Sequence, residues 1–489
     1  MAHHLANTVP SRLLMWQRVR EYAVPPSMIE TATARRAAGD WAGACAAARV
    51  DVDLDLRAVR ERHGTELVTR LRADLRRLAP DLLRWHMPRI APDGRLRPGL
   101  TVCLARYPDF GATSPQLAVR TPPAWADAGQ RMSLALWEGP GSESPGHHPH
   151  PHPDRRFRLD LHRHLWDVGR SAELARRCGA GDAVEAGGAP SVEPCSFGGP
   201  AVPDSPWAVE RWAAEAELLL RAEGRTRGAF TVRLGARSRA VLELFAPDDS
   251  HVPALRPLRE SLPPQEVAAL PVLPEAAARV LPDLELLRAG LVAPDRLHPL
   301  VAAALAESGA ASASGPASVT GAAAGPGDPH RVECRGEVHR IALRDGVLTA
   351  VDHDPAQLRR EELLVALGGP PLPCLRAIDA VHRSPEALPA VRERLRHGDV
   401  AGALAVVEGL LGPGAVLRDG PLREELRSAA ARRIDHGLFR AGLVAVHPAA
   451  GTEAAGAGAG RRPRLNRHTP PAIRRKRADR ARPRTTLTR

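Results

Sequence analysis

The sequence predicts an α+β protein with an N-terminal helical hairpin region and an antiparallel sheet, a linker, a small C-terminal domain of a β-hairpin plus helices, and a disordered basic tail. Its 489 residues are too many for one ordinary core, and about three domains are expected at roughly 150 residues each. The content of 44% apolar and 25% charged residues is typical of a globular chain. Apolar residues recur first with a helical period and then with a strand period, which indicates separate helical and sheet regions.

The helical pattern is clearest over 65–82, where the apolar residues form one stripe. These residues are Leu67, Val68, Leu71, Leu75, Leu78 and Leu82. Thr65 can cap the start of this helix, and Pro88 sets a stop. The period then changes, and short segments that end at proline or glycine clusters predict an antiparallel sheet. The predicted strands are 100–107, 116–121, 130–137 and 156–165.

Helices and hairpins are also predicted for the rest of the chain. Helices are expected over 206–223 and 275–288, and a hairpin is expected from 229–234 and 240–245. Further strands are expected over 331–335, 338–343 and 347–351, with a tight turn at Asp345-Gly346 between the last two. Asp354 caps a helix with Pro355 at its first position, and helices follow to about residue 443.

These elements divide the chain into five segments. They are a poorly ordered N-terminus over 1–24, one or more α+β domains over 25–305, an Ala/Gly/Ser/Pro linker over 306–329, a small α+β domain ending in a helical hairpin over 330–446, and a disordered basic tail over 447–489. No apolar run reaches the roughly 18 residues that cross a bilayer, so no membrane insertion is expected. The six cysteines form no C-x-x-C pair and no export signal is recognisable, so we expect a cytoplasmic protein with reduced thiols.

The positive charge of the chain is concentrated in its last residues. Of the net charge of +12, the segment 461–489 holds +11, from twelve basic residues and one acidic residue. Such a segment cannot bury enough surface to offset its ordering entropy, and a disordered polycation binds nucleic acid through the phosphate backbone. The predicted polyanion-binding residues are Arg461, Arg462, Arg464, Arg467, Arg474, Arg475, Lys476, Arg477, Arg480, Arg482 and Arg484. The alternative is a solubilising terminus without a ligand.

The basic residues are almost all arginine, because Lys476 is the only lysine. Arginine, alanine and proline dominate the composition, which resembles that of proteins from high-GC actinobacteria, where codon composition alone favours these residues. An arginine in this chain is therefore weak support for a phosphate ligand.

One short sequence occurs twice. Residues 39–46 read GDWAGACA and residues 398–405 read GDVAGALA, with an arginine four residues before each glycine. The glycine can end one helix in a left-handed conformation, and the aspartate can cap the next. This pattern resembles the turn of tetratricopeptide-like helical repeats, which implies helical hairpins that bind a protein partner. The alternative is that hairpins in an alanine-rich chain converge on similar turns.

The first candidate for chemistry is the predicted strand 156–165. If it alternates regularly, Asp160, His162 and His164 share one face and could bind one divalent metal ion. The preceding loop adds His147, His148, His150 and His152, which gives six histidines in eighteen residues. The alternative is a solvated polar face beside an extended loop, with only adventitious affinity for metals.

The second candidate is Asp352-His353-Asp354, with His339 and Asp345 nearby in sequence. Carboxylates beside an imidazole can tune it as a base. The cap role of Asp354 and the turn role of Asp345 explain these aspartates without catalysis.

No local enzyme signature is present: the chain lacks a Walker loop, a G-x-S-x-G elbow, an H-E-x-x-H motif and zinc-finger spacing. The sequence therefore favours a non-enzymatic interaction or scaffold protein, with a protein partner at its helical hairpins and nucleic acid at its tail. The alternative is a metal-dependent hydrolase or nuclease that uses Asp160, His162 and His164. No cofactor other than this divalent metal is expected.

Overall fold

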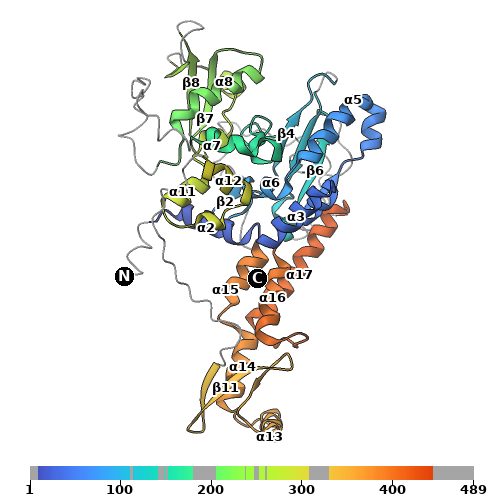
Figure 1. Ribbon diagram of the computed structural model, residues 1–489, viewed down its shortest axis with the longest axis vertical. Helices are drawn as coiled ribbons and strands as arrows, with labels where there is room; N and C mark the ends of the chain where they lie inside the picture. The colour runs from blue at the N-terminus through green and yellow to red at the C-terminus, as the bar shows by residue number, and fades with distance from the viewer. Residues whose placement is uncertain are drawn as a thin grey trace, which may run out of the picture.

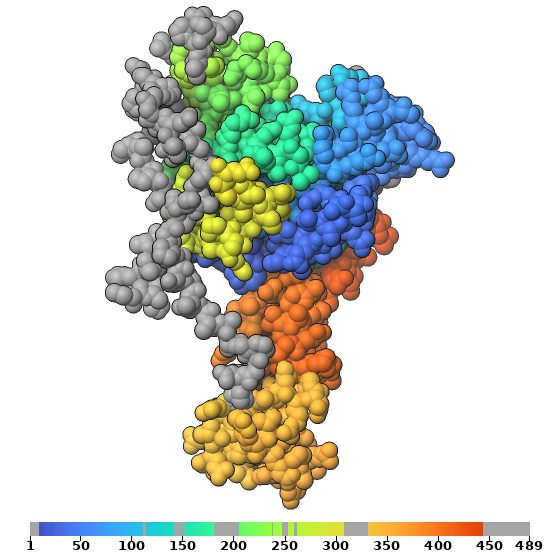
Figure 2. All heavy atoms as spheres, in the orientation of Figure 1, coloured from blue at the N-terminus to red at the C-terminus, as the bar shows by residue number. Residues whose placement is uncertain are grey.

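The computed structural model describes residues 9–110, 114–140, 148, 152–179, 205–236, 238–246, 253–258, 262–307 and 330–443. They form a mixed α+β structure, as the sequence predicts, with a four-stranded sheet and several small antiparallel sheets. Figure 1 shows a wide upper part that holds the central sheet and a narrower lower part of helices. Figure 1 shows β11 (Glu337–Arg344), in the small sheet of the C-terminal part, at the far end of the molecule from the central sheet, and Figure 2 shows the same end as spheres.

The elements up to residue 307 are as follows. The α-helices are α2 (Ser11–Tyr22), α3 (Pro26–Ala37), α4 (Trp41–Ala47), α5 (Leu56–Arg77), α6 (Pro80–His86), α7 (Leu174–Cys178), α8 (Trp212–Ala222), α9 (Pro264–Ala269), α10 (Glu275–Ala278), α11 (Pro282–Arg288) and α12 (Pro299–Glu307). The strands are β1 (Val50–Asp53), β2 (Arg89–Ile90), β3 (Arg95–Leu96), β4 (Thr101–Arg106), β5 (Gln116–Arg120), β6 (Met132–Trp137), β7 (Gly228–Arg233), β8 (Arg239–Phe245) and β9 (Ala254–Pro257). The 3₁₀ turns are η1 (Ala124–Ala126), η2 (Ala128–Gln130), η3 (Arg163–Leu165), η4 (Val168–Glu173), η5 (Val209–Arg211) and η6 (Pro294–Arg296).

The C-terminal part begins at residue 330. Its elements are β10 (His330–Cys334), β11 (Glu337–Arg344), β12 (Val347–Ala350), α13 (Pro355–Ala366), α14 (Pro373–Arg383), α15 (Leu388–Arg396), α16 (Val400–Leu411) and α17 (Pro421–Arg440).

The central sheet has the strand order β1-β6-β5-β4. Strands β4, β5 and β6 are antiparallel neighbours and correspond to three of the predicted strands. Strand β1 was not predicted; it pairs with β6 in the parallel direction, with Val50 opposite Met132. Leu71 and Leu75 of α5 and Leu104 and Leu134 of the sheet are fully buried in one core, so the helix and the sheet pack through their apolar faces.

The helix predicted over 65–82 is divided in two. Ala79 has φ −101° and ψ 93°, outside the helical region, and Pro80 is the first residue of α6. The ring of a proline disfavours helical geometry in the residue before it, so the apolar stripe continues across the break without one continuous helix. Residues 11–22, expected to be poorly ordered, instead form α2, which buries Leu13, Met15 and Val19.

The strand predicted over 156–165 is wrong. Only Leu159 N of this segment bonds to β4, at 2.7 Å from Cys103 O, after Asp154 N just before the segment has bonded to Thr101 O at 2.8 Å. The chain then turns into η3. Leu165 and the adjacent Trp166 are both buried. A regular strand would send these two neighbours to opposite faces, so core packing favours a turn over the alternating pattern.

The predicted hairpins and caps of the remaining chain are confirmed. Strands β7 and β8 pair as an antiparallel hairpin. The helix predicted over 275–288 is divided into α10 and α11, and α11 begins at Pro282. Asp345 and Gly346 have φ of 52° and 77°, as a two-residue hairpin turn requires. The side chain of Asp354 accepts a hydrogen bond from Ala356 N, which caps α13.

The two copies of the repeated sequence form two helical hairpins with the same turn. In the α3–α4 hairpin, Asp40 Oδ1 accepts from Gly43 N at 2.8 Å. In the α15–α16 hairpin, Asp399 Oδ1 accepts from Gly402 N at 3.2 Å, and Arg394 pairs with the same carboxylate at 2.9 Å. Each hairpin therefore uses its aspartate as the predicted helix cap.

The second of these turns is also a contact between the two parts of the chain. Arg49 donates to His397 O at 3.0 Å and to Asp399 Oδ1 at 3.4 Å. His397 is fully buried and stacks on Tyr22, with ring centroids 6.3 Å apart. Helix α17 adds further contacts, including an ion pair between Arg440 and Asp53 at 2.6 Å. The C-terminal helices are thus docked against the N-terminal part through direct contacts.

Gly39→Ala and Gly398→Ala test this docking as a matched pair. Both glycines have positive φ, 76° and 81°, so each substitution introduces left-handed strain of roughly 1 kcal/mol. A Cβ at Gly39 meets nothing within 4 Å, whereas a Cβ at Gly398 would lie 2.2 Å from the carbonyl oxygen of Gly129. We expect Gly39→Ala to lower the free energy of unfolding by about 1 kcal/mol and Gly398→Ala by about 3 kcal/mol. Urea unfolding measures both; equal losses would show that the Gly398–Gly129 contact does not hold the two parts together.

His397 makes this contact sensitive to acid. Burial, together with the nearby positive charges of Arg89 and Arg84, lowers the pKa of its imidazole to about 3. The unfolded chain binds a proton here below about pH 6.5, while the folded chain resists protonation down to about pH 3, so acid favours unfolding. Between about pH 6.5 and 5 this group alone removes roughly 2 kcal/mol of stability.

The variant His397→Phe keeps an aromatic ring beside Tyr22 and removes the titration. We expect urea unfolding at about pH 7 and pH 5 to show a smaller loss of stability in this variant than in the unaltered protein, by about 2 kcal/mol. His152→Gln, at an exposed histidine, should leave the loss unchanged. Equal losses in the unaltered protein and His397→Phe would exclude His397 as the acid-sensitive group.

Candidate functional site

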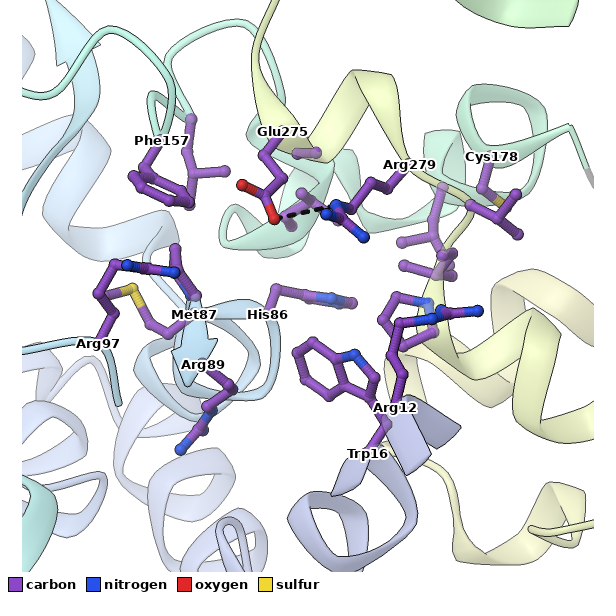
Figure 3. A pocket seen from close by; sticks show the side chains of 18 of the residues that line it. Arg12, Trp16, His86, Met87, Arg89, Arg97, Phe157, Cys178, Glu275 and Arg279 are labelled. Carbon is purple, nitrogen blue, oxygen red and sulfur yellow. Dashed lines mark ion pairs between the residues drawn. The ribbon is translucent and has the colours of Figure 1, made fainter. Parts of the chain in front are cut away.

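Arginine, histidine and aromatic side chains surround a cavity of about 320 Å³ in the N-terminal part. Its walls come from α2, the segment around β2 and β3, the segment 156–178, η5, α10 and α11. Figure 3 shows Trp16 and His86 on one side of the cavity, with Glu275 and Arg279 opposite them and Arg97 beside Phe157 at one end. The cavity therefore lies where segments far apart in the sequence meet.

Arginine dominates the polar lining of this cavity. The eight lining arginines are Arg12, Arg20, Arg89, Arg97, Arg156, Arg177, Arg211 and Arg279. Four carboxylates pair with five of them: Glu285 with Arg12, Asp283 with Arg20, Glu215 with Arg177, and Glu275 with both Arg156 and Arg279. Arg211 left aside, seven positive charges set against four negative ones leave an excess of three among the described residues, so the cavity has a positive potential that favours anions.

Arg97 and Arg89 carry much of this excess. The guanidinium of Arg97 lies 5.1 Å from the centre of the Phe157 ring, and it makes no ion pair with the described part of the chain. Burial lowers the pKa of Arg97, and the neighbouring Arg156 lowers it further. Within the described residues, Arg89 donates to the backbone oxygens of Arg84 at 2.7 Å and of Gly94 at 3.4 Å, and burial lowers its pKa to about 9. Both positive charges are thus disfavoured in the ligand-free protein.

The remaining wall is apolar and aromatic. Met15, Trp16, Met87 and Phe157 line the cavity together with several leucines. Two histidines also line it: burial holds the pKa of His86 and of His164 well below the ordinary value, so both rings are neutral near pH 7. The buried atoms His86 Nε2 and His164 Nδ1 find no hydrogen-bond partner among the described residues. The lining therefore offers charged donors, unfilled polar positions and flat apolar surfaces.

The structure does not bring the three predicted metal ligands together. Asp160 is bound by Arg158 at 2.6 Å and by Arg106 at 3.2 Å. His162 contacts Glu215 at 3.1 Å, and these two residues belong to a buried cluster with Arg177. Burial would raise the pKa of Glu215, but the contacts with His162 and Arg177 outweigh it and hold the value at about 2.

The described structure does not gather Asp160, His162 and His164 into one group of metal ligands in the way the sequence predicts. The segment turns where a strand was expected. The rings of His162 and His164 make an edge contact, with centroids 5.8 Å apart, whereas Asp160 pairs with Arg158 and Arg106. Of the three, only His164 lines the cavity. Within the described ranges, the group whose ligand atoms converge for a metal ion does not include any of them.

The other predicted positions have varied surroundings. His148 Nε2 lies 2.8 Å from Thr121 O, and the His152 ring makes an edge contact with Trp137. His147 and His150 lie outside the described residues, as do all the predicted polyanion-binding residues of 461–489.

The second sequence candidate contributes one residue to a site that the sequence did not predict. Asp352 pairs with Arg340 at 2.7 Å, and Asp354 caps α13, so both aspartates have structural partners. His353 instead lies beside Cys334 and Cys374, and the ligand atoms of these three residues are all within 4.8 Å of one another. This Cys-His-Cys cluster has a donor set that could bind a metal ion.

Neither site has a local signature that could have been recognised. The cysteines are 40 positions apart, and the cavity draws its arginines from five separate segments of an arginine-rich chain. No protein-family model, curated protein or solved structure matches this chain. Among the described residues, no helix combines the length and apolar character needed to span a membrane. The functional argument therefore depends on the chemistry of the sites.

Proposed function

We propose that this protein binds a small organic anion in the arginine-lined cavity. The observation that carries the proposal is the charge imbalance among the described residues: seven arginines other than Arg211 face four carboxylates, in a cavity that also has aromatic walls. The ligand class that fits is a carboxylate, sulfonate or phosphate group attached to a flat apolar body.

The size and the charge arrangement both support this class of ligand. A volume of about 320 Å³ lies within the range of small-molecule sites. A guanidinium forms strong paired hydrogen bonds to a carboxylate or phosphate, and such bonds gain strength where water is displaced. Because the charge of Arg97 is disfavoured without a ligand, an arriving anion would relieve that cost as well as form new bonds.

Arg97→Met tests the proposal with the fluorescent anion anilinonaphthalene sulfonate as the probe. This probe joins an anionic group to aromatic rings and should bind the unaltered protein at one site per chain. Methionine keeps the apolar stem and removes the charge, so the dissociation constant should rise about tenfold or more. Urea unfolding of the variant should show equal or greater stability, because the lost charge was disfavoured in the folded protein.

Arg221→Met is the matched control. Arg221 is exposed on α8 and pairs with Glu217 at 2.6 Å, outside the cavity lining. The substitution Arg221→Met removes the same charge and should leave the affinity for the probe unchanged. If Arg97→Met binds the probe as tightly as this control does, the cavity is not the anion site.

A second role is proposed for the basic tail. We also propose that residues 461–489 contact nucleic acid; this rests on the +11 charge of that segment against a net of +1 for the other 460 residues. Protein partners at the helical hairpins and a cytoplasmic location stay predictions from the sequence.

Deletion of 461–489 tests the tail separately from the cavity. The full chain should bind double-stranded DNA at low salt and lose roughly a thousandfold in affinity over a fourfold rise in salt, whereas the truncated chain should not be retained. The truncated chain should still bind anilinonaphthalene sulfonate, and Arg97→Met should still bind DNA. Undiminished DNA binding by the truncated chain would refute the role of the tail without affecting the cavity.

A further inference from the structure

We propose that Cys334, His353 and Cys374 bind one zinc ion in the C-terminal part of the chain. The three residues come from three different elements. Cys334 is the last residue of β10, His353 follows β12 in the turn before α13, and Cys374 is the second residue of α14. Their ligand atoms lie within 4.8 Å of one another, so small shifts of side chains would bring all three around one ion.

Burial distinguishes this cluster from a chance grouping on the surface. Cys334 and Cys374 have no exposed surface, and His353 is 8% exposed. The Nε2 atom of His353 is buried and has no hydrogen-bond partner among the described residues. A buried nitrogen without a partner is costly, and a metal ion at this position would satisfy it.

The position of the His353 ring is also fixed. His339 of β11 stacks against it, with ring centroids 4.1 Å apart and planes inclined by 13°. His339 is therefore a positioning residue, which holds the imidazole plane without contacting the ion itself.

The donor set favours zinc among common metal ions. Thiolate sulfur and imidazole nitrogen bind zinc well, whereas magnesium and calcium prefer oxygen donors. Two thiolates and a neutral imidazole would neutralise the charge of Zn²⁺, so the buried complex carries no net charge. On binding, each thiol loses its proton to solvent, and water takes the fourth position of the tetrahedral ion.

The location suggests a structural use for the ion. Cys334 and Cys374 belong to the second hydrophobic core, which is built from a three-stranded sheet and the C-terminal helices. Such small units often need a metal ion or disulfide to supplement the core. One ion would join β10, the turn after β12 and the start of α14, and it would bind the reduced form of both cysteines.

The test uses the full chain in a thiol-free reductant, stripped with a chelator, dialysed, and then titrated with zinc. We expect about one ion per chain by elemental analysis. Cobalt in its place should give intense visible absorption with a sulfur-to-metal charge-transfer band, which marks tetrahedral thiolate coordination. Cys374→Ser and His353→Ala should both lose the stoichiometric ion, whereas Cys178→Ser, at a half-buried thiol outside the cluster, should retain it.

A second measurement covers the case in which the ligand variants fail to fold. In the unaltered protein, zinc should protect Cys334 and Cys374 from alkylation, as read by mass spectrometry, and should leave the modification of Cys178 unchanged. No bound zinc in the reduced chain overturns the proposal. So does equal alkylation of the two cysteines with and without zinc, or a disulfide between them that forms equally fast when zinc is present.

Discussion

One buried ion pair organises the cavity and the segments around it. Arg20 of α2 and Asp283 of α11 are 263 residues apart and both buried, with Nη2 and Oδ2 at 2.7 Å. Arg20 also donates to Trp85 O at 2.7 Å, and Trp85 Nε1 donates to Asp283 Oδ1 at 3.0 Å. The pair thus joins α2, α6 and α11. The cost of removing both charged groups from water offsets much of the attraction between them. The ion pair therefore specifies this arrangement more than it adds to stability, because loss of either partner would leave a buried charge without its counter-ion.

The aromatic and charged lining of the cavity depends on that arrangement of α2, α6 and α11. Trp16 and Trp85 both lie against the Arg20 guanidinium, whose carbon is 5.0 Å from the centre of the Trp16 ring and 4.3 Å from the centre of the Trp85 ring. Arginines that pair with a carboxylate, such as Arg20, can have a purely structural role. Arg97 is different, because its charge is opposed by Arg156 and disfavoured by burial. A protein optimised for stability alone would replace such a residue, and its presence is consistent with a site whose balance is completed by an anion.

The sequence predicts what is decided locally. The Asp345-Gly346 turn, the Asp354 cap and strands β4 to β6 depend on a few adjacent residues, and all are found in the structure. The strand prediction for 156–165 was wrong even though apolar and polar residues alternate there. The burial of both Leu165 and Trp166 required a turn instead. The cavity and the Cys-His-Cys cluster could not be predicted, because each depends on long-range contacts. Cys334 and Cys374, for instance, meet only after β10 packs against α14.

The repeated turn shows that local sequence determines the conformation of a turn but not the contacts that the turn makes. Both copies end a helix at a glycine with positive φ and cap the next helix with aspartate. Gly39 remains exposed, whereas Gly398 is buried against Gly129. Asp399 is 4% exposed and receives Arg49 in addition to the arginine that both copies share. The same eight-residue pattern therefore specifies a turn in both places but an internal contact in only one. A partner that recognised the tip of such a hairpin could reach the first copy, while in the second copy the tip already holds the two parts of the chain together.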